Sequence, residues 1–152
     1  MHRCFSYIGR QPASYQPQLI SLGPACVYFP VVVHELGHAI GFYHEHTRHD
    51  RDDYIDVLYE NIYDYFEDQF YKIPEGQSDT LGYGYDMQSI MHYDKDFYSL
   101  DGSDTIRPKD PSKTVGMAKV LSPLDIAKAN ALYNCEFLFI CSCRCMCHIM
   151  SS

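Results

Sequence analysis

The eleven residues from His34 to His44 read HELGHAIGFYH and have the spacing of a catalytic zinc site. His34 and His38 are four residues apart, so on an α-helix they project from one face and both reach the same metal ion. Gly41 lets the backbone leave the helix through positive φ, which returns His44 as a third ligand. Three histidines leave the fourth position of a tetrahedral zinc open for water. The pattern therefore predicts a metal-dependent hydrolase that binds one zinc ion.

Glu35 is the candidate general base of this site. It follows His34 directly and points partly off the ligand face, within reach of a water on the metal. Zinc lowers the pKa of such a water to roughly 7. An HExxH string alone arises by chance on many helices, where the histidines are only partly exposed polar positions. The added glycine and third histidine exclude most chance matches and favour the zinc site.

Two further stretches show a family resemblance. They are HEHTRHDRDDYI, from His44 to Ile55, and SIMHY, from Ser89 to Tyr93. Together with the zinc motif they resemble the astacin family of metzincin zinc endopeptidases. The resemblance implies that Met91 is the Met-turn methionine beneath the metal, and that Tyr93 lies near the zinc and stabilises the oxyanion. The alternative is that SIMHY is a buried turn in which both residues only pack.

The resemblance covers nearly all of residues 4–135. It includes CFSYIGR from Cys4 to Arg10, QLISLGPAC ending at Cys26, and SPLDIAKANALYNC ending at Cys135. It implies a disulfide between Cys4 and Cys26. It also implies that Cys135 pairs with a cysteine near the start of the mature domain, which this sequence lacks.

The sequence also departs from the family pattern. Pro30 stands where a glycine is usual, and His46 and His49 replace the usual glutamine and proline. Glu45 matches the family position that contacts the mature N-terminus. Many members prefer an acidic residue just after the cut, and Arg107 could serve such a preference, although an exposed arginine is more often only a solubilising charge. None of the departures removes a zinc ligand.

The resemblance implies an α+β, metzincin or zincin-like catalytic domain with an active-site helix, a Met-turn and a C-terminal helix. We expect a partial peptidase domain in residues 1–135 that lacks most of the upper N-terminal β-sheet, because so few residues precede His34. Residues 136–152 form a cysteine-rich tail that we expect to be a disordered or aberrant extension. Its cysteines alternate from Cys141 to Cys147, a spacing that is poor for one tetrahedral zinc, although a second metal site there stays open.

Local patterns place the elements. Cys4–Ile8 alternates like an edge strand, and the family resemblance implies that this strand lines the cleft. Val31–Ile40 has the pattern of the zinc helix. Arg48–Gly84 is expected to be mostly irregular. A second helix is marked by a capping box, and its apolar residues are expected to form one packed face. The residues that carry this helix prediction are Ser122, Pro123, Asp125, Ile126, Ala129 and Tyr133.

Charge and cysteine content limit the partners and the compartment. Twelve basic and twenty acidic residues give a net charge of −8, which would repel nucleic acid and anionic lipid surfaces. No apolar run of about 20 residues could span a membrane. Seven cysteines favour an oxidising compartment and secretion, although the start of the sequence has no signal-peptide pattern. The acidic run Asp50–Asp56 could bind calcium, but ion pairs with Arg48 or Arg51 are the favoured interpretation.

We therefore expect a secreted zinc endopeptidase in which Glu35 activates a metal-bound water to hydrolyse peptide bonds of protein or peptide substrates. Acidification should release the metal as histidines with an ordinary pKa near roughly 6.5 take up protons. The alternative is a truncated, non-catalytic zinc-binding protein whose upper sheet is too incomplete to hold a substrate. The sequence indicates no particular oligomeric state.

Overall fold

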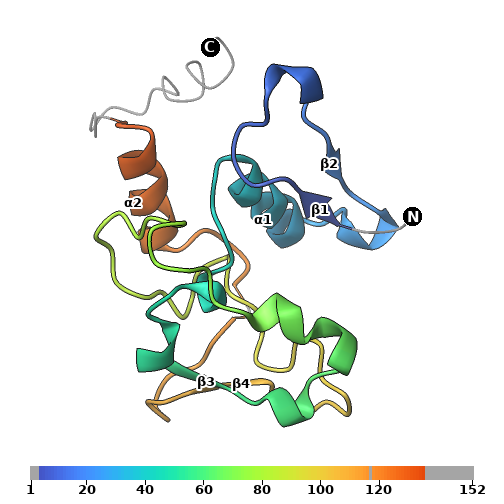
Figure 1. Ribbon diagram of the computed structural model, residues 1–152, viewed down its shortest axis with the longest axis vertical. Coiled ribbons are helices and arrows are strands. Elements are labelled where there is room, and N and C mark those ends of the chain that lie inside the picture. Colours follow the sequence, from blue (N-terminus) through green and yellow to red (C-terminus); the bar gives the residue numbers. More distant parts are fainter. Residues whose placement is uncertain (1–3, 117, 136–152) are drawn as a thin grey trace.

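The computed structural model describes residues 4–116 and 118–135, which form a small α+β fold with little regular structure (Figure 1). Two helices and four short strands are joined by loops and 3₁₀ turns. The helices are α1 (Phe29–Ala39) and α2 (Pro123–Leu132), and the strands are β1 (Phe5–Ser6), β2 (Ile20–Ser21), β3 (Ile55–Val57) and β4 (Ile106–Pro108). In the described ranges, neither helix is long and apolar enough to cross a membrane.

Helix α1 carries the zinc motif and lies beside the β1–β2 pair (Figure 1). It begins two residues before the predicted start and ends one residue before the predicted end, with Pro30 in its first turn as expected. Gly41 follows at a φ of 119°, a conformation that glycine adopts without a steric penalty. The amide of Gly9 donates to the carbonyl of His38 over 2.9 Å. The segment after β1 is therefore fastened to the helix at a predicted ligand.

A disulfide joins Cys4 to Cys26, the pair that the family resemblance implies. Cys4 precedes β1, and Cys26 ends the short turn just before α1. The bond therefore ties the predicted edge strand to the start of the zinc helix.

The apolar core is built around the two-stranded sheet formed by β3 and β4. These antiparallel strands pair Ile55 with Pro108 and Val57 with Ile106. The buried side chains of this core are Ile55, Ile62, Phe70, Tyr93, Ile106 and Val115. Strand β3 and several 3₁₀ turns lie within the segment predicted to be mostly irregular. Three residues give too short a pattern to reveal a strand whose partner is fifty residues away.

Arg51 holds the loop after the zinc motif against this core. Its buried guanidinium donates to the carbonyl oxygens of His46, over 3.0 Å, and Phe70, and also pairs with Asp52 over 3.0 Å. The neighbouring Arg48 pairs with Asp50. The predicted ion pairs of the acidic run are thus present. Within the described residues, the His34, His38 and His44 group is the one cluster suited to a metal ion.

Helix α2 begins as predicted but buries a different face. Ser122 is its N-cap and forms the capping box with Asp125. The expected apolar face is wrong, because Ile126 and Tyr133 are exposed while Asp125 and Lys128 are buried. Asp125 accepts hydrogen bonds from the Ser89 hydroxyl and the Ile90 amide, so polar contacts rather than apolar packing attach this helix.

We predict that Arg51→Ala lowers the free energy of unfolding by about 2–4 kcal/mol, because it leaves buried carbonyl oxygens without donors. Denaturant unfolding followed by circular dichroism would measure the loss. The matched control is Arg107→Ala, since Arg107 is exposed and only pairs with Asp56 at the surface; we expect a change below about 0.5 kcal/mol. Equal effects of the two changes would contradict the role given to Arg51.

Candidate zinc site

Three histidine nitrogens converge at the centre of the molecule. The Nε2 atom of His44 lies 3.1 Å from that of His34 and 3.2 Å from that of His38. A tetrahedral zinc with bonds of about 2.0–2.1 Å would separate its nitrogen ligands by about 3.3 Å. The predicted ligands from α1 and from the loop after Gly41 are therefore brought together at a spacing that fits zinc.

The other ring nitrogens fix the protonation of this group. Nδ1 of His34 lies 2.8 Å from the Ile90 carbonyl oxygen, and Nδ1 of His38 lies 2.7 Å from that of Phe42. A carbonyl only accepts, so each Nδ1 carries the proton and each Nε2 presents its lone pair to the centre. The lone pairs of His34 and His38 are therefore available to a cation. His44 brings its Nε2 atom within 3.1–3.2 Å of them, so the donor set fits the predicted metal.

Burial keeps the ligands neutral. It lowers the pKa of His34, lowers that of His38 to about 4, and lowers that of His44 well below the ordinary value. The cause is the loss of hydration of the charged imidazolium, which the backbone acceptors only partly offset. A metal ligand must be neutral imidazole, so the site is prepared for metal at neutral pH.

Glu35 lies in the same cleft as the three histidines. This cleft has a volume of about 1120 Å³. The Glu35 side chain is 5% exposed, and its Oε2 atom has no hydrogen-bond partner among the described residues. Burial raises the pKa of this carboxyl group. A buried carboxylate with an unused oxygen and a raised pKa is suited to accept and return a proton.

Met91 lies against the underside of α1. Its side chain is 2% exposed, and a Cβ atom added at Gly37 would lie 2.5 Å from its sulfur. The carbonyl of Met91 accepts from the Glu45 amide over 2.9 Å, directly after the third histidine. Gly37 therefore permits the close approach of the SIMHY turn to the helix, and the turn supports the loop that carries His44.

Tyr93 is buried beside the histidines and lines the cleft. Its ring centroid lies 4.5 Å from that of His44 and 3.9 Å from that of His46. Burial raises the pKa of the Tyr93 hydroxyl, so the group stays protonated and can donate a hydrogen bond. The three histidines, Glu35 and Tyr93 thus line one cleft, and Met91 lies against the helix that carries two of the histidines.

Comparisons with known proteins identify the family. The sequence model of the Astacin peptidase family matches residues 1–134. The chain belongs to the astacin family. Blastula protease 10 of Paracentrotus lividus is 44% identical over 141 residues, which are 91% of this chain and 23% of that protein. Zinc metalloproteinase nas-6 of Caenorhabditis elegans is 44% identical over 135 residues, or 88% of this chain and 38% of that protein.

A solved structure gives the same result for the fold. High choriolytic enzyme 1, a hatching enzyme zinc-protease from the medaka Oryzias latipes, superposes with a TM-score of 0.82 at 37% identity. The match covers 90% of this chain and 66% of that one. The chain spans about a quarter to two fifths of the length of the two curated relatives above. This astacin-family chain thus has the zincin-like fold and a three-histidine group that could bind a metal.

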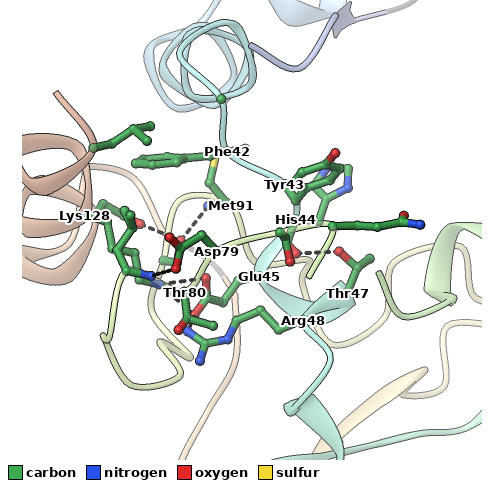
Figure 2. Close-up of a pocket in the computed structure, with 17 residues that line it drawn as sticks. Phe42, Tyr43, His44, Glu45, Thr47, Arg48, Asp79, Thr80, Met91 and Lys128 are labelled. Carbon is green, nitrogen blue, oxygen red and sulfur yellow. Dashed lines mark hydrogen bonds and ion pairs between the residues drawn. The ribbon is translucent and has the colours of Figure 1, made fainter. Parts of the chain in front are cut away.

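Sequence reasoning missed the buried partner of Glu45. Lys128 of α2 contacts the two carboxylate oxygens of Glu45 over 2.9 and 2.8 Å, and Arg48 donates to one of them over 3.1 Å. Figure 2 shows these groups around a cavity of about 250 Å³ behind the third histidine. The only signal in the sequence was a lysine on the polar side of an apparently amphipathic helix, where an exposed charge is the usual expectation.

His46 is a second residue whose position the sequence did not reveal. It is fully buried, its Nε2 lies 3.0 Å from the Gln69 carbonyl oxygen, and its Nδ1 has no partner among the described residues. Its ring stacks on that of Tyr93. The histidine that departs from the family pattern therefore places an aromatic surface under the predicted oxyanion donor.

We predict that the folded chain retains zinc well below pH 6.5. A lowered pKa keeps His38 neutral as the pH falls through 6.5, so protons compete with the metal only near pH 4. The unfolded chain takes up protons from 6.5 downward, so the fold loses stability over the same window. Zinc content after dialysis at stepped pH would test this, with unfolding followed in the same samples. Half-release already at pH 6.5 would contradict the lowered pKa.

Proposed function

We propose that this chain is the zinc-binding catalytic part of a secreted endopeptidase, with one zinc ion held by His34, His38 and His44. The observation that carries the proposal is the convergence of three neutral Nε2 atoms in a cleft where Glu35 offers an unpartnered carboxylate oxygen. Family membership supports it, because the similar proteins include a zinc metalloproteinase and a hatching enzyme zinc-protease. The substrates are proteins or peptides.

Bound zinc supplies polarisation of the scissile carbonyl and acidification of a water molecule. Glu35 takes the proton from the attacking water and returns it to the leaving amine, a cycle that suits its raised pKa. Tyr93 donates a hydrogen bond to the developing oxyanion. Loss of such a donor commonly costs roughly 3 kcal/mol of transition-state stabilisation.

The edge of β1 is the proposed binding surface for an extended substrate. Phe5 and Ser6 line the cleft, and β2 is the one strand that pairs with β1 in the described part of the chain. A peptide can add to the opposite edge through main-chain hydrogen bonds, which are independent of sequence. The Cys4–Cys26 disulfide holds this edge beside the zinc helix, and it also supports secretion into an oxidising compartment.

Ser89–Tyr93 is proposed to be the Met-turn, and residues 1–135 to be the peptidase domain. The buried position of Met91 under Gly37 supports the first assignment. The largely absent upper sheet stays a prediction. Residues 136–152, with the alternating cysteines, lie outside the described residues. No observation on the described residues favours the non-catalytic alternative.

We predict that Glu35→Ala retains zinc but loses peptide hydrolysis by at least about a hundredfold, because it removes the proton carrier and leaves the ligands in place. Zinc content and cleavage of casein or gelatin would be measured on the same preparation. Chelation should abolish the wild-type activity.

His38→Ala is the matched comparison, since it removes a ligand from the same helix and should lose both zinc and activity. Unchanged cleavage by the Glu35→Ala variant would refute the general-base assignment. Zinc bound by the wild-type chain without any chelator-sensitive cleavage would refute the proposed peptidase activity.

A further inference from the structure

The cleft around the zinc site has an uneven charge distribution. Among the described residues that line it are the acidic residues Glu35, Asp68 and Asp94, and none of the lining residues is a lysine or an arginine. His92, which also lines the cleft, is neutral because burial lowers its pKa to about 4. Arg107, the basic group that could have served an acidic substrate residue, pairs with Asp56 and does not line the cleft. The walls of the cleft away from the three histidines therefore favour binding of a cation over binding of an anion.

The neighbours of Asp68 in the chain are anchored on one wall of the cleft. Asp68 belongs to the 3₁₀ segment η6 (Asp64–Phe70), whose last residue, Phe70, is fully buried and packs edge-on against Tyr93 at 5.8 Å between ring centroids. Gln69 lies between Asp68 and Phe70 in the chain, and its carbonyl oxygen is hydrogen-bonded to His46. Asp68 itself is exposed, and it forms no ion pair with any other described residue; its side chain accepts only from Gln69, over 3.2 Å.

Two exposed tyrosines line the same cleft as Asp68. Tyr65 and Tyr71, three residues before and after Asp68, line the cleft and are 92% and 58% exposed. An aromatic face attracts a cation even at an exposed site, and arginine also stacks on it. A carboxylate and two such rings in one cleft offer the chemistry that binds a lysine or arginine side chain.

We propose that Tyr65, Asp68 and Tyr71 form a specificity subsite for a basic side chain of the substrate, and that the cleft disfavours acidic peptides. The inference rests on the proposed function, since it names the substrate class of the same cleft. The buried, unpartnered oxygen of Glu35 is an independent sign that a ligand enters this cleft. The chain would thus differ from the acidic preference of many astacins.

The test uses matched peptides that differ at one position, carrying arginine, lysine, glutamine or glutamate on either side of the bond to be cut. Binding is measured by fluorescence anisotropy on the zinc-loaded Glu35→Ala chain, and kcat/KM is measured on the zinc-loaded chain with Glu35 intact. We expect the arginine and lysine peptides to have roughly tenfold higher affinity and roughly tenfold higher kcat/KM than the glutamate peptides. The difference should shrink at high salt.

Asp68→Asn should reduce this selectivity roughly three- to fivefold, the effect of removing one partly shielded charge. Asp64→Asn is the matched control, because Asp64 lies in the same segment, is exposed and does not line the cleft. Selectivity should be unchanged in this control. Thermal melts of both variants establish that they fold equally well.

The outcomes separate the two proposals. Equal binding of basic and acidic peptides, tighter binding of acidic ones, or equal effects of Asp68→Asn and Asp64→Asn would overturn the subsite. A preference for basic peptides in binding, without any cleavage by the zinc-loaded chain, would support the subsite and refute the peptidase activity. Cleavage of basic and acidic peptides at equal rates would support the peptidase activity and refute the subsite.

Discussion

The convergence of three neutral imidazole nitrogens is the constraint on which the rest of the structure depends. The ring nitrogens of residues from α1 and from the loop after it lie 3.1–3.2 Å apart, so the surrounding elements must hold the three rings in place. Two carbonyl acceptors fix the rings of His34 and His38, and Gly41 directs the chain back toward them. Burial suppresses protonation, which would otherwise disperse the group as like charges. The position of the site therefore depends on contacts outside the three rings.

Those other contacts are largely polar. His44 is held through its neighbour Glu45, whose amide bonds to Met91 and whose carboxylate is bound by Lys128. A buried ion pair contributes little net stability compared with apolar packing, but removal of either partner is costly. The network thus supplies geometry more than stability: it fixes helix α2, the loop after the zinc helix and the SIMHY turn relative to one another. Apolar packing alone would fix the position of His44 less tightly.

Features that depend on residues close together in the sequence were predicted, and features that depend on residues far apart in the sequence were missed. Local spacing predicted the zinc helix, the glycine turn and the capping box of α2, because each depends on neighbours within a few residues. Family resemblance supplied Tyr93 and Met91, which lie far along the chain. The strand pair β3–β4 and the buried role of Lys128 could not be predicted, since each depends on a partner fifty to eighty residues away. The apolar face expected for α2 failed for the same reason: buried partners, not hydrophobicity, selected the face.

The charge distribution of the cleft also could not be predicted from the sequence. A net charge of −8 says only that the surface repels anions in general, and it cannot tell which carboxylates face a substrate. That depends on η6, where Phe70 is inserted in the core beside Tyr93 and Asp68 is consequently turned into the cleft. The packing that supports the proposed oxyanion donor therefore also sets the charge beside it. A change in this segment that alters the core would shift the position of the carboxylate, so the proposed roles of Tyr93 and Asp68 are coupled through one buried phenylalanine.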